Sequence, residues 1–136
     1  MLCFGMLNAA PFVAMERALR DQDEAVFKAQ WRLDGFERNL VGGSGLAGRE
    51  VFEQGSRKKW FLKPDPGRVT LLENGAAMIV PCEIWAWEKG RAVDKVDLLL
   101  VRENDGYLAL GGGEKREEVE ALASRWLKRE PLEPPP

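Results

Sequence analysis

Three turn dipeptides divide residues 68–111 into apolar runs and constrain the fold more than any other feature of the sequence. Asn74–Gly75 lies between two such runs and predicts a β-hairpin, because both residues of this turn take positive φ. Lys89–Gly90 and Asp105–Gly106 mark two further reversals. The connections are too short for parallel crossovers, so the strands must pair antiparallel as a meander. The predicted strands are 68–73, 76–88, 92–102 and 107–111.

Helical patterns precede the meander. The first predicted helix begins near Pro11, whose fixed φ suits a first turn, and it carries Phe12 on an apolar face. Asp21, with Glu24 three residues later, has the capping-box pattern and predicts the start of a second helix, which Gly35 ends. The chain up to this glycine is therefore predicted to be largely helical.

Two further helices are expected. Residues 36–41 could form a brief strand, and the glycine-rich residues 42–48 form a loop. A third helix is predicted from about Arg49, and the cations at 57–59 suit its last turn because they complement the helix dipole. After the meander, residues 114–128 carry one apolar stripe and predict a final helix.

The length of 136 residues suits one domain with one sizeable core. We therefore expect a single α+β domain over residues 1–130 and a mobile proline-rich tail over 131–136. Cys3 and Cys82 are the only cysteines, so no disulfide framework holds the fold, as expected in a reducing cytoplasm. The apolar residues 1–15 invite a signal-peptide reading, but no basic residue precedes them and they run into the first helix. We expect a cytoplasmic protein in which Cys82 is a buried, inert thiol.

The charge balance argues against polyanionic partners. Twenty basic and 22 acidic residues leave a net charge of −2, so no overall positive field attracts nucleic acid or an anionic membrane. Basic and aromatic residues alternate over 57–63, but helix-end charges and a core Trp60 account for that pattern. No run approaches the roughly 18–20 apolar residues that span a bilayer. We predict neither nucleic-acid nor membrane contact.

The chain has no histidine, which excludes Ser–His–Asp and Cys–His nucleophile systems because the general base is missing. Two distant cysteines without imidazole do not furnish a zinc or iron ligand set. A carboxylate-only magnesium or calcium site stays open, although no EF-hand spacing occurs. Residues 43–48 match G-x-G-x-x-G, but the long preceding strand of a βαβ unit is missing. We predict no cofactor and assign no residue to a metal.

Both faces of the two central strands are mostly apolar. In strand 76–88, Glu83, Trp85 and Trp87 alternate with Cys82, Ile84 and Ala86. In strand 92–102, Val96, Leu98 and Leu100 alternate with Val93, Leu99 and Val101. A half-exposed antiparallel strand would instead alternate apolar with polar side chains. Helices of the same chain can cover one face and a second copy the other, so we expect a homodimer through the sheet.

Three acids, Glu83, Asp94 and Asp97, interrupt these apolar strands, where burying a charge is costly. A carboxyl group in an apolar pocket has a raised pKa and can act as a general acid or base. Asp97 is the best candidate, because Val93, Leu99 and Val101 share its face. The alternative is a sheet-edge or interface acid paired with a nearby cation. The cations near it are Lys95, Arg91 and Arg102.

Three segments carry a family resemblance. AMERALRDQDEAVFKAQW (14–31) looks like an opening helix pair, LAGREVFEQ (46–54) like a recurrent Gly-Arg-Glu helix start, and VDLLLVRENDGYLALGG (96–112) like a closing hairpin. These segments resemble the nuclear transport factor 2-like superfamily, the cone fold shared by ketosteroid isomerases and SnoaL-like polyketide cyclases. The resemblance implies N-terminal helices packed on a curved four-to-five-stranded antiparallel sheet, here with an additional C-terminal helix. It also implies an apolar pocket inside the cone, and dimers.

Enzymes of this superfamily use Asp, often with His or Tyr, at that pocket. The resemblance therefore implies Asp97 as a base and Tyr107 as a donor to a developing oxyanion.

Three functions remain open from the sequence. The first is a non-catalytic module that binds a small, mostly apolar molecule in the cone. Its expected ligand-binding residues are Trp31, Phe36, Trp60, Glu83, Trp85 and Trp87. The second is an acid–base isomerase or cyclase that uses Asp97 and Tyr107. The third is a structural or partner-binding dimer domain whose interior is full.

Overall fold

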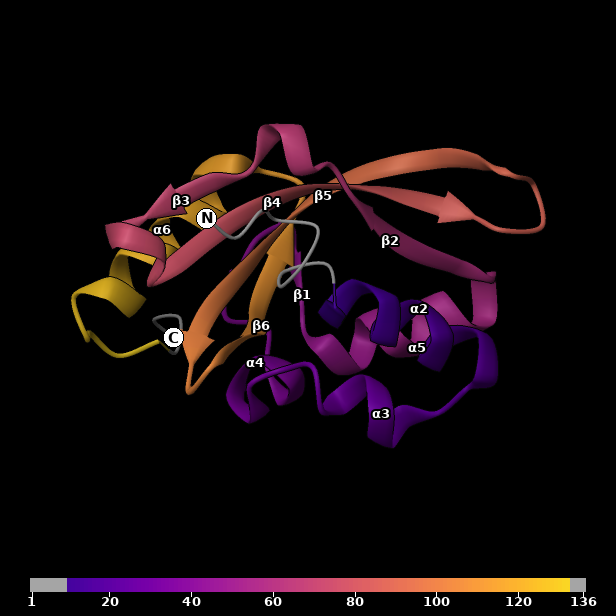
Figure 1. Cartoon of the computed structure of the whole chain (residues 1–136), viewed down its shortest axis with the longest axis horizontal. Helices are drawn as coiled ribbons and strands as arrows, with labels where there is room; N and C mark the ends of the chain where they lie inside the picture. Colours follow the sequence, from indigo (N-terminus) through magenta and orange to yellow (C-terminus); the bar gives the residue numbers. More distant parts are fainter. Residues whose placement is uncertain (1–9, 133–136) are drawn as a thin grey trace.

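The computed structural model describes residues 10–132, in which five α-helices pack on one six-stranded antiparallel sheet (Figure 1). The helices are α2 (Ala10–Asp21), α3 (Glu24–Lys28), α4 (Leu33–Glu37), α5 (Gly48–Lys58) and α6 (Arg116–Leu127). The strands are β1 (Gly45–Leu46), β2 (Trp60–Pro64), β3 (Thr70–Leu72), β4 (Ala77–Ala86), β5 (Arg91–Glu103) and β6 (Gly106–Gly113). Two 3₁₀ turns, η1 (Pro66–Arg68) and η2 (Glu73–Gly75), flank β3. The predicted α+β class with a C-terminal helix is confirmed, with six strands where four to five were expected.

The meander predicted from the turn dipeptides is confirmed. The sheet order is β1-β6-β5-β4-β2, and β3 also pairs with β4. Asn74 and Gly75 take the expected positive φ values of 57° and 86°. At the β5–β6 reversal, however, the positive φ falls on Asn104 (55°), one position before the predicted Asp105–Gly106 pair.

Strand β2 was not predicted from the sequence. Residues 57–63 were interpreted as a helix end followed by a core tryptophan, but α5 stops at Lys58 and Lys59 takes a left-handed φ of 58°. The chain then runs antiparallel to β4, with Leu62 opposite Ile84. A left-handed C-cap on lysine instead of glycine gives no sequence signal, which is why the reversal was missed.

The helix boundaries before β1 also differ from prediction. The N-cap of α3 is Asp23, not Asp21, and its Oδ1 accepts a hydrogen bond from the Val26 amide at 3.2 Å. Gly35 does not end a helix but lies inside α4. A Cβ at Gly35 would lie 2.2 Å from the Leu110 carbonyl oxygen, so this glycine permits close approach of α4 to β6. The brief strand expected within residues 36–41 is not formed, and pairing begins instead at β1.

We call the sheet face that packs on α2, α3 and α5 the inner face. Phe27 is the centre of its aromatic packing, with ring centroids 5.3 Å from Phe52 and 6.1 Å from Trp31. From the sheet, Met78, Leu98 and Leu100 enter this core. The inner face is therefore closed by the N-terminal helices, as the sequence predicted.

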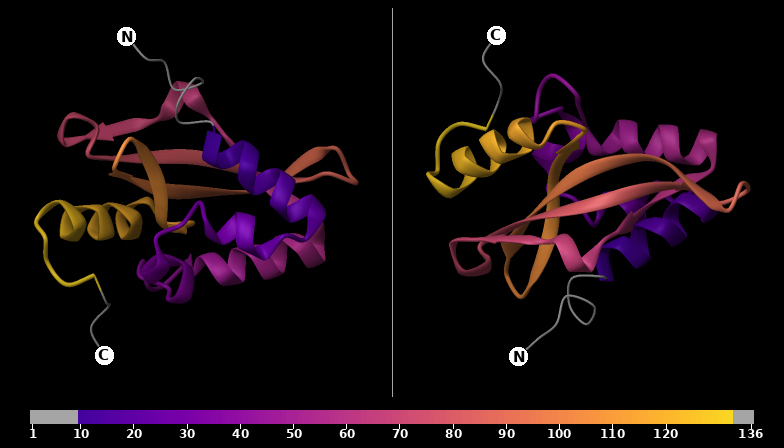
Figure 2. Two further views of the ribbon diagram at one scale, coloured as in Figure 1. Left: turned by 60° about the horizontal axis from the view of Figure 1, so that its bottom comes forward. Right: turned by 90° about the horizontal axis from the view of Figure 1, so that it is seen from above.

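The opposite, outer face is covered by α6. From α6, Val119, Leu122 and Ala123 pack on the sheet residues whose side chains point away from the inner core. These residues are Ala77, Ile79, Leu99, Val101 and Leu110. Figure 2 shows α6 on one side of β6 and α5 on the other. The sequence predicts that another copy of the protein provides this second cover, but a helix of the same chain provides it. The homodimer itself stays a prediction.

The glycine-rich loop ties α6 to the sheet. The backbone N and the Oγ of Ser44 donate hydrogen bonds to Glu118 Oε1, at 3.0 and 2.5 Å. These bonds lower the pKa of the Glu118 carboxyl. Gly43, with φ of +34°, lies so close that a Cβ there would be 1.8 Å from Glu118 Oε2. The loop is thus occupied by the protein's own carboxylate, in agreement with the interpretation that it is no dinucleotide site.

Within residues 10–132, no helix has the length and apolar character needed to cross a bilayer.

Replacing Leu122 with alanine should lower the free energy of unfolding by about 2–4 kcal/mol, because the side chain is fully buried between α6 and the outer face. The matched control is Leu33→Ala on α4, whose side chain is 62% exposed and whose loss should change stability by less than about 0.5 kcal/mol. Urea denaturation of both variants measures the difference. An equal loss of unfolding free energy in the two variants would contradict the role of α6 as a cover of the sheet.

Candidate functional site

The interior of the cone holds little space. Between α5 and the inner face lies a cavity of about 70 Å³ with mostly apolar walls. Its apolar walls include Leu46, Val51, Trp60, Leu62, Ile84 and Leu98. Pockets for small molecules usually enclose about 300–1,000 Å³, so this cavity has no room for a ligand of that size.

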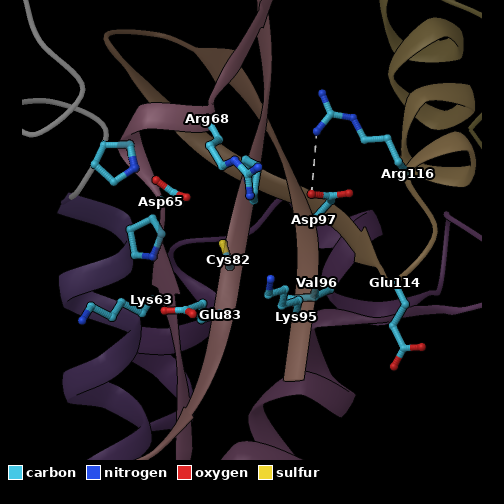
Figure 3. Close-up of a pocket in the computed structure, with 13 residues that line it drawn as sticks. Lys63, Asp65, Arg68, Cys82, Glu83, Lys95, Val96, Asp97, Glu114 and Arg116 are labelled. Atoms are coloured by element: carbon cyan, nitrogen blue, oxygen red, sulfur yellow. Dashed lines mark ion pairs between the residues drawn. The ribbon is translucent and has the colours of Figure 1, made fainter. Parts of the chain in front are cut away.

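A larger groove opens on the outer face, where α6 no longer covers the sheet (Figure 3). It has a volume of about 750 Å³ and lies between η1 and the start of α6, with β4 and β5 as its floor. Its cations are Lys63, Arg68, Lys95 and Arg116. Its acids are Asp65, Glu83, Asp97 and Glu114. We call this surface the outer groove.

Asp97 lies at the floor of the outer groove, in register with Pro81 on β4 and Gly113 on β6. Its side chain is only 17% exposed. Arg116 contacts it across 3.7 Å, between Nη1 and Oδ1, and the dashed line in Figure 3 marks this ion pair. Burial raises the pKa of the Asp97 carboxyl; the Arg116 guanidinium opposes this shift and Glu120 adds to it. The sequence therefore found the perturbed acid but not its cation, since it named only Lys95, Arg91 and Arg102 as partners.

Arg116 is the first residue of α6 and is held in place by three groups. Its Nη2 donates to Thr70 Oγ1 at 2.6 Å, and its Nε lies 3.6 Å from Glu120 Oε2, in addition to the contact with Asp97. A cation in the first turn of a helix is disfavoured by the helix dipole. That unfavourable placement was a sequence signal that could have singled out Arg116.

Three of the four cations of the outer groove, Lys63, Arg68 and Lys95, make no ion pair with any residue in the range 10–132. The side chains of Arg68 and Lys95 also make no side-chain hydrogen bond there. Lys63 lies over the Trp85 ring, 4.3 Å from its centroid, and the indole Nε1 of Trp85 donates to Glu83 at 3.0 Å. The groove therefore has unpaired cations on η1 and on β5, at opposite sides of β4.

The structure does not bring the two predicted catalytic residues together. Asp97 faces outward, whereas Tyr107 packs against the inner core. The Tyr107 hydroxyl donates to the Gly75 carbonyl at 2.6 Å, and Tyr107 pairs with Arg102, five positions along β5 from Asp97. At about 3.3 Å per residue, the two positions are about 16 Å apart along the strand and on opposite faces. They cannot act on one substrate atom in this arrangement.

The predicted aromatic ligand set is also divided. Trp31 and Phe36 are core residues, 4% and 0% exposed, and only Trp60 lines the inner cavity. Glu83 lines the outer groove, and Trp85 lies beside it. Trp87, predicted on the same face as Trp85, lies beyond the end of β4 and packs against the inner core.

The two tryptophans differ in their neighbours. Strand β4 ends at Ala86, so Trp87 lies one residue beyond the strand. Trp87 stacks on Phe61, with ring centroids 6.4 Å apart. The register shift between Ile84 and Trp85 leaves the extra residue, Val93, on β5, so it does not change the alternation of β4.

Cys82 is buried, as predicted. It is 3% exposed, and its Sγ donates to the Val80 carbonyl at 3.3 Å. Burial, and then the nearby Asp97 carboxylate, raise the pKa of the Cys82 thiol far above its ordinary value. The thiolate form is therefore not accessible at neutral pH.

Comparison of this chain with protein-family models, with curated proteins and with solved structures finds no match. Over residues 10–132, no group of three or more His, Cys, Asp or Glu side chains is arranged to hold a metal ion.

Asp97→Asn should change how stability depends on pH. Because the pKa of Asp97 is raised on folding, the folded protein holds more protons than the unfolded chain above about pH 4, and wild-type stability falls as pH rises through this window. Asparagine cannot ionise, so the variant should melt at a higher temperature than wild type at pH 7, with the gap closing towards pH 4.

The matched control for this measurement is Asp94→Asn on the same strand, where the residue is exposed. Its melting profile should run parallel to that of wild type. A parallel profile for Asp97→Asn as well would contradict the burial of the Asp97 charge.

Proposed function

We propose that this protein is a non-catalytic binding module that takes a small anionic molecule in the outer groove. The observation that carries the proposal is that Arg68 and Lys95 line a groove of about 750 Å³ and make no ion pair with the described residues. A volume in this range is typical of small-molecule sites, and a few well-placed polar groups are typical of their walls. An anion would give both cations the charge partner that they lack.

The inner cavity argues against an apolar ligand inside the cone. At about 70 Å³ it accommodates little more than solvent, and most of the aromatics that were expected to line it pack elsewhere. Enzymatic acid–base chemistry is disfavoured for a separate reason, because Asp97 and Tyr107 face opposite sides of the sheet. A binding role therefore fits the geometry better than either alternative that uses the interior.

The resemblance to the nuclear transport factor 2-like superfamily stays part of the proposal. The curled antiparallel sheet and the N-terminal helices support it. In that superfamily the pocket lies inside the cone, whereas the site proposed for this chain lies outside it. A homodimer through the sheet would have to form beside α6, where the exposed surface carries the charged residues of the outer groove.

Small anions should stabilise the protein against heat. A thermal-shift series with phosphate, citrate and sulfate between pH 5 and pH 7 should raise the melting temperature with at least one anion, because binding only to the folded state favours folding. Arg68→Gln and Lys95→Gln should each weaken that binding about tenfold, since a hydrogen bond to a charged group contributes about 1.5–3 kcal/mol.

The matched control is Lys89→Gln. Lys89 is an exposed cation on the β4–β5 turn and does not line the groove. Binding that is lost equally in the control, or the absence of any shift with all three anions, would refute the proposed function.

A further inference from the structure

We infer that the outer groove selects a phosphate monoester over an oxyanion that carries no proton, such as sulfate, because Asp97 requires a proton to be shared with the ligand. The inference rests on the proposed function and specifies the ligand of the same site. Three observations carry it: the two arginines beside Asp97, the even charge balance of the groove, and its size.

Two guanidinium groups come from opposite walls of the groove. Arg68 belongs to η1 and Arg116 to α6, and in Figure 3 both side chains extend towards the part of the floor where Asp97 lies. The planar fork of a guanidinium group matches the oxygens of phosphate, sulfate and carboxylate alike. The arginines therefore attract an oxyanion but do not choose between oxyanions.

Asp97 makes the groove discriminate between oxyanions. An anion held between Arg68 and Arg116 brings an oxygen towards the Asp97 carboxyl, and two negatively charged oxygens in contact repel each other. The contact becomes a hydrogen bond when one proton lies between them. A phosphate monoester has its second pKa near about 6, so about a tenth of it carries that proton at pH 7 and protonation of the rest costs little. Sulfate has no such proton, so Asp97 itself must be protonated first.

The charged groups around Asp97 do not remove the need for a proton between Asp97 and the bound anion. The groups that face it or line the groove with it are Lys63 of β2, Asp65, Arg68 of η1, Glu83 of β4, Lys95 of β5, Glu114, and Arg116 and Glu120 of α6. With Asp97 included, the groove has four cations and four acids, and Glu120 adds a further acid from α6. An anion can pair with Arg68 and Lys95, but because the net charge of the groove is zero, an anion without a proton leaves the occupied groove with a net negative charge beside Asp97.

The size of the groove favours an ester over free phosphate. A volume of about 750 Å³ far exceeds what one phosphate group fills. The remaining walls carry Lys63, Glu83 and Glu114, which suit a small polar organic group with hydroxyls or amines. The ligand class is therefore a phosphomonoester of a small polar molecule.

Calorimetric titration at pH 7 tests the inference with four probes: inorganic phosphate, glycerol 3-phosphate, sulfate, and vesicles that contain phosphatidic acid. Glycerol 3-phosphate should bind at least tenfold more tightly than sulfate, and more tightly than inorganic phosphate. The vesicles should not bind, because the four cations of the groove are matched by four acids and provide no positive field to attract an anionic membrane surface. Tighter binding to vesicles than to glycerol 3-phosphate would overturn the assignment to a soluble ester.

Asp97→Asn should remove the discrimination, because the amide can donate a hydrogen bond without any added proton. In this variant sulfate and phosphate should bind within about threefold of each other, whereas Arg116→Gln should weaken the binding of both. Sulfate that binds wild type as tightly as phosphate at pH 7, or discrimination that survives in Asp97→Asn, would overturn the inference.

Proton uptake provides a test that needs no variant. Titrations in buffers of different ionisation enthalpy should show that sulfate binds with uptake of one proton and that its affinity rises as pH falls. No proton uptake with sulfate would also overturn the inference. Anions that bind without discrimination leave the proposed function standing, whereas the failure of every anion to bind removes both.

Discussion

Burial of the central strands on both faces is the constraint on which the rest of the structure depends. Leu99 and Leu100 are neighbours on β5, point to opposite sides and are both fully buried. Burial of each such side chain contributes about 1.5–3 kcal/mol, so neither face can be left in water. The inner face receives α2, α3 and α5, and the outer face receives α6 together with Leu40 and Val41 of the loop after α4.

The outer groove follows from the limited length of α6. The helix begins at Arg116 and covers Ile79 and Leu99, and beyond that point the outward positions of the same strands become polar, with Glu83 and Asp97. At this boundary between the covered and the uncovered part of the sheet, Arg116 of α6 forms its ion pair with Asp97 of β5. The candidate site is thus formed by the edge of the outer cover.

The parts of the fold that follow local rules could be predicted from the sequence. Asn74–Gly75 predicted the first hairpin, because few pairs of consecutive residues can both take a positive φ. The apolar stripe of residues 114–128 predicted α6. Strand β2 could not be predicted, because its start depends on a left-handed conformation at Lys59 that sequence does not favour. The surroundings of Trp87 could not be predicted either, because β4 ends at Ala86 and the alternation of residues 76–88 does not indicate that end.

The candidate site was predictable only in part, for a similar reason. Asp97 was identified because an acid inside an apolar strand is unusual. Its cation was not, since Arg116 reaches it from a helix whose position against the sheet is set by tertiary packing and by the Ser44–Glu118 hydrogen bonds. Arg68 reaches the groove through the 3₁₀ turn between two edge strands, which no periodic pattern indicated.

We propose that this protein binds its ligand on the outside of the sheet and not inside the filled cone. The direct test is NMR of the labelled protein, with amide chemical shifts followed during titration with glycerol 3-phosphate. Binding in the outer groove predicts that the largest shifts occur in four of its segments, residues 63–68, 81–83, 95–97 and 114–116. Shifts centred instead on Leu46, Val51 and Leu62, which line the inner cavity, would contradict it.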